Sequence, residues 1–245
     1  MLNFHIISIF PESFESYLNS SILKRAQTAG LIKIHLYHLR DFTLDKHRNV
    51  DGRPYGGGPG MVMAVQPIIL AVAKIKSKIK NQKSKIILFA PNGEEFNNQI
   101  AEKLANPSTP FNKAQSKKLR ARSTKHLILI CGHYEGIDAR VKKILKAEEY
   151  TIGPYVLTGG ELPAMVAIET ISRLVPGVIG KEQLLKERIS KTGGFLEYAQ
   201  YTRPEVYKVF KGNKVESWRV PKVLLSGDHK KIGEWKMAHG KVIEK

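Results

Sequence analysis

Three glycine-containing turns are the stretches best suited to chemistry, and each follows a short strand-like run. They are Pro91–Gly93 after "KIILFA", Gly132–Gly136 after "LILIC", and Gly153–Gly160 after "EEYTI". Because glycine has no Cβ, the backbone N–H and C=O groups of such turns can approach a ligand closely. Apolar side chains near these turns, such as Leu88 and Leu157, would line a binding site for a flat ring. The pattern favours a heterocycle such as adenine over a phosphate.

A phosphate-binding loop is the main alternative for glycine-rich turns, and the sequence argues against it. The P-loop pattern G-x-x-x-x-G-K-[ST] does not occur. Another glycine-rich loop, Tyr55–Met61, has neither a preceding apolar strand nor a lysine. From its spacing alone, this loop is equally well interpreted as a flexible turn.

The elements that must position these turns alternate between strands and helices. Short apolar runs predict strands in "FHIISIF", "LIKIHLYHL", "KIILFAP" and "KHLILICG", and helical spacing is found in "QPIILAVAKIKSK", "EEFNNQIAEKLA" and "ELPAMVAIETISRLV". This alternation predicts an α/β fold with a parallel sheet covered on both faces. Since ligands bind at the carboxyl ends of parallel strands, we expect the three turns to converge on one crevice.

Two polar segments interrupt this pattern. Residues 106–125 are rich in Pro, Ser and Lys and are interpreted as a surface insertion. Residues 180–192 are interpreted as a flexible linker, because the composition changes after them and both tryptophans follow. We therefore expect a first domain over 1–179 and a small, mostly helical domain over 193–245.

Composition narrows the class of partner. The chain has 245 residues, 42% of them hydrophobic, and a formal net charge of +18. That excess favours a polyanion such as nucleic acid, although a lysine-rich organism would give the same excess on all of its proteins. The single cysteine excludes an internal disulfide, and no apolar run has the ~20 residues of a membrane span. We expect a cytoplasmic protein with no membrane contact.

Six long stretches are specific enough to indicate a family. They are "DKHRNVDGRPYGGGPGMVM", "LILICGHYEGIDARV", "IGPYVLTGGELPAM", "SRLVPGVIG", "YTRPEV" and "LLSGDHKKIGEW". Together, and in this order, they resemble the bacterial tRNA (guanine-N1-)-methyltransferases of the SPOUT superfamily. The resemblance covers nearly the whole chain except 106–125 and 181–192. It implies a C-terminal trefoil knot in the first domain, which periodicity does not predict.

The resemblance also implies a binding site for S-adenosyl-L-methionine, gripped largely by backbone groups of the knot. We expect the chain to touch this ligand most closely at Gly153, Gly159 and Gly160, and we expect Gly159 to need a positive φ. Glu135 and Glu161 could accept hydrogen bonds near this ligand, although as isolated residues they would more often be surface glutamates. The implied site consists of Leu88, Phe89, Ala90, Pro91, Gly93, Gly132, Tyr134, Glu135, Gly136, Ile152, Gly153, Tyr155, Leu157, Gly159, Gly160 and Pro163.

The implied reaction methylates N1 of the guanosine 3′ to the anticodon, position 37 of tRNA. Arg173 matches the family's arginine that is proposed to contact the target guanine, and the alternative is an arginine at a helix end that faces water. Members of the family usually carry an acidic residue in the linker before the motif "YTRPEV". Counting back from that motif without gaps places Ile189 at the acidic position, and a shift of two residues places Glu187 there. We predict that Glu187 is the base, and Glu182 is a weaker candidate. The alternative is that Glu187 is a solvated charge of the linker with no catalytic role.

The remaining implications concern partners. The residues expected to face tRNA are His47, Arg48, Asp51, Arg53, Tyr55, Gly57, Gly58, Arg203 and His229. Arg203 and His229 are equally well interpreted as surface charges that do not contact tRNA. The family implies a homodimer whose sites combine the knot of one chain with the tail of the other, and we expect no metal and no DNA partner.

Three alternatives remain open on the sequence. The first is a SPOUT methyltransferase that acts on ribose or on rRNA. The second is a basic RNA-binding protein without activity. The third uses Cys131 as a covalent nucleophile, but Cys131 lies in an apolar run, where cysteine is usually an inert core residue.

Overall fold

The structure is a computed structural model that describes residues 1–80, 82–105, 125–180 and 196–242. Its contacts divide the chain into two compact units, Met1–Gly180 and Lys181–Lys245. Each unit is described by itself. Residues 181–192, which include the predicted linker acids, lie outside the described residues.

The first unit is built on the parallel sheet that the sequence predicts. Five strands lie in the order β2-β1-β6-β5-β7, and all neighbours run parallel. Apolar residues that are buried on both faces of β1 and β6 explain why these strands occupy the middle of the sheet. The strands are β1 (Leu2–Ser8), β2 (Ile32–His38), β5 (Ser84–Glu95), β6 (Lys125–Ile130) and β7 (Glu148–Thr151).

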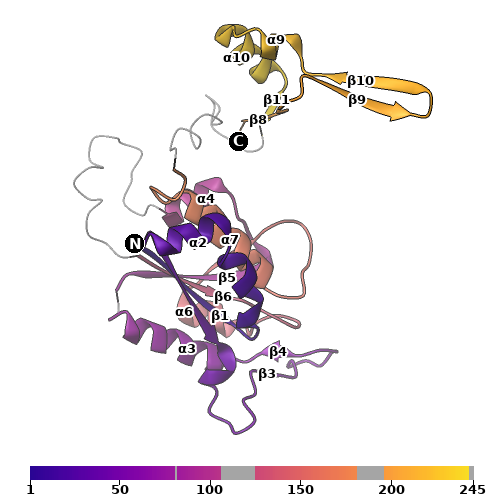
Figure 1. Ribbon diagram of the computed structural model, residues 1–245. Coiled ribbons are helices and arrows are strands. Elements are labelled where there is room, and N and C mark those ends of the chain that lie inside the picture. Colours follow the sequence, from indigo (N-terminus) through magenta and orange to yellow (C-terminus); the bar gives the residue numbers. More distant parts are fainter. Residues whose placement is uncertain (81, 106–124, 181–195, 243–245) are drawn as a thin grey trace. The chain divides into compact units, whose positions relative to one another are not determined.

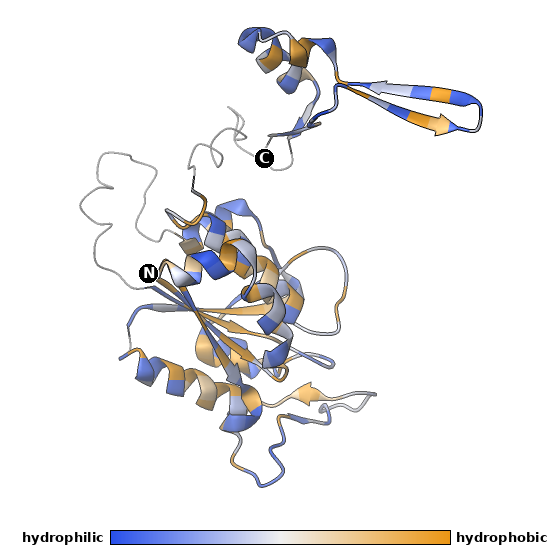
Figure 2. Ribbon diagram, in the orientation of Figure 1, coloured by the Kyte–Doolittle hydropathy of each residue, from blue (hydrophilic) through white to orange (hydrophobic). Residues whose placement is uncertain are grey.

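Helices cover both faces of this sheet (Figure 1). One buried cluster joins the sheet to α1, α2, α4 and α7, and the other joins it to α3 and α6. Figure 2 shows the central strands as hydrophobic between these layers. The helical elements are η1 (Pro11–Phe14), α1 (Glu15–Leu18), α2 (Ser21–Thr28), η2 (Leu39–Phe42), α3 (Val65–Lys78), α4 (Asn98–Ala105), α6 (Arg140–Leu145) and α7 (Glu161–Arg173).

A small hairpin leaves the first unit between η2 and α3. It consists of β3 (Asp51–Gly52) and β4 (Val62–Met63), which pair antiparallel on either side of the glycine-rich loop. Figure 1 shows this loop projecting beyond the layers. The trefoil knot implied by the resemblance stays a prediction.

Over its described residues, 196–242, the second unit is not mostly helical, so that expectation is wrong. Its described residues form the strand pairs β8 (Leu196–Tyr198) with β11 (Gly240–Val242) and β9 (Val206–Lys211) with β10 (Lys214–Arg219). The same described residues contain two helices, α9 (Lys222–Leu225) and α10 (His229–Ala238). Gly212, at φ +58, supplies the left-handed turn between β9 and β10. The Gly-Asn pair in "KVFKGNKVESW" is a hairpin signal that outweighs helical spacing.

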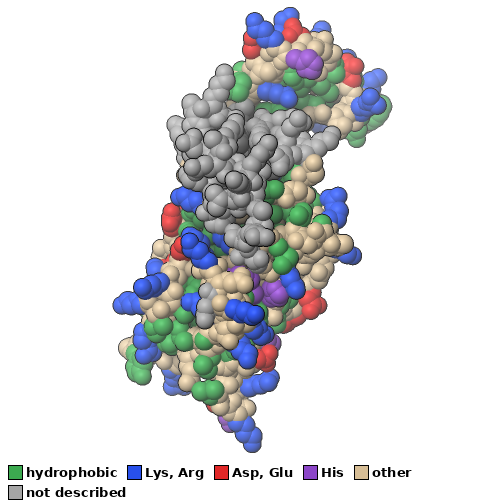
Figure 3. All heavy atoms as spheres, turned by 90° about the vertical axis from the view of Figure 1, so that its left-hand side faces the viewer, with side chains coloured by type: hydrophobic (Ala, Val, Ile, Leu, Met, Phe, Trp, Pro, Cys, Tyr) green, Lys and Arg blue, Asp and Glu red, His purple; other side chains and the backbone are tan. Residues whose placement is uncertain are grey.

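Within the described part of the chain, no helix is both long and apolar enough to cross a membrane. Figure 3 shows one face of the molecule, on which Lys and Arg side chains outnumber acidic ones.

Candidate active-site cleft

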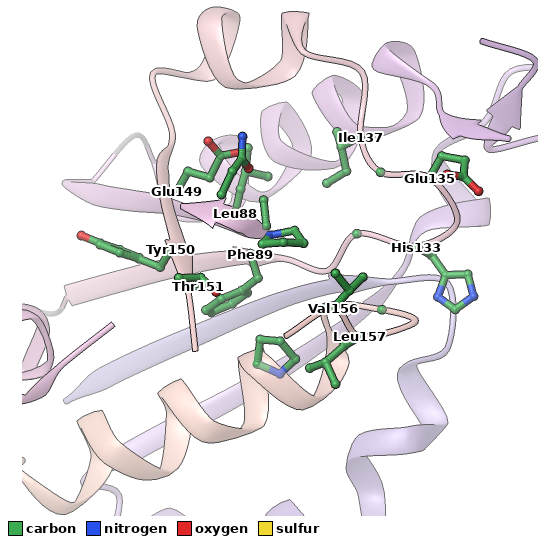
Figure 4. A pocket seen from close by; sticks show the side chains of 18 of the residues that line it. Leu88, Phe89, His133, Glu135, Ile137, Glu149, Tyr150, Thr151, Val156 and Leu157 are labelled. Atoms are coloured by element: carbon green, nitrogen blue, oxygen red, sulfur yellow. The ribbon is translucent and has the colours of Figure 1, made fainter. Parts of the chain in front are cut away.

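A cleft of ≈ 570 Å³ opens at the carboxyl ends of β5, β6 and β7. The turn after each of these strands contributes to its lining, as the glycine pattern predicts. Figure 4 shows Leu88 and Phe89 of β5 together with Val156 and Leu157 of the loop before α7. The three turns therefore form one site, although they lie far apart in the sequence.

All the predicted ligand-binding residues except two line this cleft. The exceptions are Gly93 and Gly153. A Cβ on Gly93 would lie 2.6 Å from the carbonyl carbon of Tyr150, so Gly93 lets β5 pass close to β7. A Cβ on Gly153 would lie 2.5 Å from the ring of Tyr155. Both glycines thus serve local packing rather than the wall of the cleft.

Gly159 and Gly160 hold the last turn against the turn after β6. Gly160 N–H donates to the carbonyl of Gly132 at 2.8 Å, and Gly159 bridges to His133. A Cβ on Gly160 would lie 2.8 Å from the backbone of both Cys131 and Gly132. The expected positive φ at Gly159 is wrong. A Cβ on Gly159 would collide with Oε2 of Glu161 and would lie 2.8 Å from Nδ1 of His133, so a larger residue would displace both side chains.

Glu161 is buried behind the cleft rather than exposed on the surface. Its carboxylate accepts a hydrogen bond from the buried hydroxyl of Ser8 at 2.6 Å, and that hydroxyl accepts one from the N–H of Phe10 at 2.8 Å. Glu161 begins α7, where the helix dipole stabilises a negative charge. It therefore fixes the start of α7 against the end of β1.

Cys131 is unsuited to nucleophilic catalysis. The thiol is fully buried, and burial, followed by the negative charge of Glu161, raises the pKa of Cys131 well above its usual value. Since the thiolate is the nucleophilic form, the thiol stays inert at neutral pH. This environment argues against the covalent alternative.

Glycine spacing missed several lining residues. Some are neighbours in the same turns, but Lys142 and Glu149, which form an ion pair at the rim, come from α6 and β7 and carry no sequence signal. The ring Nδ1 of His133 is buried and, among the described residues, has no hydrogen-bond partner. The missed residues are Asn92, His133, Ile137, Asp138, Ala139, Lys142, Lys143, Glu149, Tyr150, Thr151, Val156 and Thr158.

The family is decided by comparison with known proteins. The family model of the tRNA (guanine-1)-methyltransferase TrmD matches residues 2–109 and 107–243. This chain belongs to that family. A tRNA (guanine-N(1)-)-methyltransferase of Thermomicrobium roseum is 48% identical over 96% of this chain and 77% of that protein. One from Clostridioides difficile is 42% identical over 96% of this chain and 90% of that protein.

A solved member of the tRNA (guanine-1)-methyltransferase family also has the same fold. It is the crystal structure of tRNA (m1G37) methyltransferase from Aquifex aeolicus, with a TM-score of 0.71 and 32% sequence identity. The match covers 97% of this chain and 88% of that one. The parallel-sheet SPOUT fold expected from the sequence is confirmed by this likeness.

The loop that the family resemblance assigns to the substrate lies beside the cleft. Glu135 N–H donates to the carbonyl of Met61 at 3.0 Å, and Met63 N–H donates to that of Gly136 at 2.9 Å. Tyr55 is 100% exposed. Asp51, in β3, is half-buried, while His47, Arg48, Arg53, Gly57 and Gly58 are exposed. This loop therefore forms an exposed border to one side of the cleft.

The other residues that the family resemblance assigns lie elsewhere. Arg173 is exposed at the last position of α7, whose first turn lines the cleft. At 1.5 Å per residue, that end of α7 is about 18 Å from Glu161. Arg203 and His229 are exposed in the second unit, and Glu187 lies outside the described residues.

Proposed function

We propose that this protein transfers a methyl group from S-adenosyl-L-methionine to N1 of the guanosine at position 37 of tRNA. One observation supports it above the others: in a chain of the tRNA (guanine-1)-methyltransferase family, the three glycine-containing turns line one cleft. The Aquifex relative is described as a tRNA (m1G37) methyltransferase, which supports position 37 as the target.

The cleft suits the methyl donor in size and lining. Its volume of ≈ 570 Å³ falls within the range of small-molecule sites. Leu88, Phe89 and Leu157 offer an apolar wall for adenine, and the turns offer backbone groups around it. Glu135 adds a negative charge at the rim, which favours a cationic ligand, whereas Glu149 is already paired with Lys142. When bound, the donor supplies an already activated methyl group.

The protein must then make guanine N1 nucleophilic. N1 carries a proton at neutral pH, and we assign its removal to the carboxylate of Glu187 as the N1–carbon bond forms. Such a base typically contributes ~10²–10⁴-fold. We assign Arg173 to O6 of the guanine, where a guanidinium stabilises the negative charge that develops as the proton leaves.

We further propose that the protein acts as a homodimer in the cytoplasm, with tRNA as its nucleic-acid partner. The position of Arg173, at the far end of α7 and about 18 Å from Glu161, supports a site completed by a second copy. The family resemblance motivates the same arrangement. The net charge of +18 suits the polyanionic tRNA.

Transfer of a labelled methyl group to an unmodified tRNA transcript tests this function. We expect 1-methylguanosine in the nucleoside digest, and we expect none when position 37 is changed from guanosine to adenosine. A ribose-methylated product would instead identify another activity of the superfamily. Binding of tRNA without any transfer would indicate an RNA-binding protein and would overturn the proposal.

A further inference from the structure

The β9–β10 hairpin of the second unit has aromatic residues exposed on both of its faces. β9 and β10 pair antiparallel around the Gly212–Asn213 turn. Within this unit, Figure 1 shows the hairpin extending away from α9 and α10. A two-stranded hairpin is only marginally stable on its own, and a directly opposed aromatic pair contributes only about 0.2–1 kcal/mol to its stability. The exposed aromatic residues therefore call for a role other than core packing.

Strand register assigns each side chain to one of two faces, because directly opposed residues point to the same side. Tyr207 opposes Trp218, Val209 opposes Glu216, and Lys211 opposes Lys214. We call these six residues the Trp218 face. The opposite face, called the Phe210 face, consists of Val206, Lys208, Phe210, Val215, Ser217 and Arg219.

The Trp218 face presents two aromatic rings to solvent. Tyr207 is 61% exposed and Trp218 is 66% exposed, and they form a directly opposed pair near the open end of the hairpin. Neighbouring cross-strand side chains lie about 5 Å apart at Cβ. Two rings at this spacing form a platform on which flat groups can stack.

The hairpin that carries this platform is cationic, and its positive side chains are divided between the two faces. Residues 206–219 contain four cationic side chains, at Lys208, Lys211, Lys214 and Arg219, and a single acid, Glu216. Glu216 is held across the hairpin by Lys211, with Nζ and Oε2 3.0 Å apart. Lys214 therefore remains as positive charge on the Trp218 face itself. A partner that combines flat rings with negative charge suits this surface.

We propose that the Trp218 face binds tRNA, with unpaired bases stacking on Tyr207 and Trp218 and the adjoining phosphates meeting Lys214. Exposed aromatic rings beside lysines are how proteins bind single-stranded nucleic acid without reading its sequence. This inference rests on the proposed function, which supplies tRNA as the substrate. It adds a docking surface distant in sequence from the residues that line the cleft.

Matched alanine variants test the platform. Affinity for unmodified tRNA should fall at least ~5-fold in Trp218→Ala and in Tyr207→Ala, the loss expected for one stacked base. Phe210→Ala, on the opposite face and 72% exposed, is the control and should change affinity less than twofold. Trp218→Phe should retain most of the affinity because it keeps a ring. Affinity for S-adenosylmethionine, whose cleft lies in the first unit, should stay unchanged in all four.

Fluorescence gives a readout that a merely structural role would not change. The chain has two tryptophans, Trp218 and Trp235, so Trp235→Phe leaves Trp218 as the sole emitter. Stacked bases should quench its emission and protect it from iodide as tRNA is added. The same titration with Phe210→Ala in this background should give the same quenching.

Three results would overturn the inference. One is tRNA affinity that is equal in Trp218→Ala and wild type, and another is an equal loss in Phe210→Ala. The third is loss of self-association by Trp218→Ala with tRNA affinity intact, because the face would then contact protein. A wild-type chain that binds tRNA through this face but transfers no methyl group would overturn only the proposed function.

Discussion

At the residue scale, Gly160 is the tightest point between the cleft and the backbone behind it. Gly160→Ala places a Cβ against the backbone of Cys131 and Gly132, which cannot move aside as a side-chain end can. The last turn must shift, so we expect at least a tenfold loss of S-adenosylmethionine affinity by calorimetry. Gly233→Ala, which has no neighbour within 4 Å, is the control and should bind normally. Unchanged affinity in Gly160→Ala would place the ligand elsewhere.

The proposed base gives a second prediction at this scale. Glu187→Gln should slow single-turnover methyl transfer by roughly 10²–10⁴-fold, because the amide cannot accept the N1 proton. Affinities for donor and tRNA should stay within about twofold. Glu182→Gln is the matched control and should retain activity. A loss smaller than tenfold in Glu187→Gln would show that another group takes the proton.

How much of the site the sequence predicts depends on what each residue does. Glycines that let the backbone meet a ligand follow strands in a recognisable pattern, so the turns around Gly132 and Gly160 were predictable. Gly93 and Gly153 have the same signature but serve packing, which only coordinates distinguish. Lys142 and Glu149 reach the rim through the packing of α6 beside β7, which no local pattern encodes.

At the element scale, β1, β2 and β6 bring three histidines together at one place in the sheet. The ring of His5 stacks on His35 at 4.7 Å, and its Nε2 lies 2.9 Å from Nδ1 of His126. Its Nδ1 lies 3.2 Å from the hydroxyl of Tyr37, over whose ring Lys78 lies. Burial, then the charges of His35, His126 and Lys78, lower the pKa of His5 to about 3.

A lowered pKa makes the first unit sensitive to acid. Below about pH 6.5, His5 binds more protons in the unfolded chain than in the folded one. The contribution of neutral His5 to the free energy of unfolding is therefore complete above pH 6.5 and is lost as the pH falls toward 3. We expect the unfolding free energy to drop by about 1–2 kcal/mol between pH 7.5 and pH 5, seen as a lower melting temperature.

A variant distinguishes His5 from the other groups that titrate in this pH range. His5→Asn can still form hydrogen bonds but cannot titrate. It should be less stable than wild type at pH 7.5 and should show a flatter dependence on pH. Equal pH slopes for the two proteins would assign the acid sensitivity to other residues.

The elements themselves were predictable where burial dictates a simple pattern. Mainly apolar runs identified β1, β5 and β6, since a strand covered on both faces buries most of its side chains, although the buried His5 and His126 interrupt the pattern. The β9–β10 hairpin was missed because its exposed side chains give no burial pattern, and only the Gly212–Asn213 turn marks it. Solvent-facing elements depend on turn chemistry, a weaker signal than hydrophobic periodicity.

At the scale of the whole molecule, the net charge of +18 predicts that tRNA binding is governed by salt. Lys and Arg contacts release counterions from the phosphates, so log affinity should fall linearly with log salt concentration. Lys214→Ala should lower that slope by about one, while Trp218→Ala should weaken binding with the slope unchanged. An affinity that stays flat over a severalfold range of salt would argue against a basic tRNA surface.

The proposed dimer makes the last prediction, because complementation reveals which chain supplies each part of a site. Gly160→Ala disables the cleft, and Glu187→Gln disables the linker base. If each site joins the cleft of one chain to the linker and tail of the other, a mixed dimer of the two variants has one site with both defects and one with neither. The two variants should therefore be co-expressed with different tags and purified together.

The mixed dimer should regain about half of the wild-type rate, since one of two symmetric sites is intact. At a donor concentration well below the dissociation constant of Gly160→Ala, each variant alone should give no more than about a tenth of the wild-type rate. A dimer of wild type with the double variant Gly160→Ala/Glu187→Gln is the control. That control has one defect in each shared site and should be nearly inactive. The opposite pattern, an active control and an inactive mixed dimer, would mean that each chain builds its own site. Failure to recover any mixed dimer, together with monomer-sized sedimentation, would remove the dimer from the proposed function.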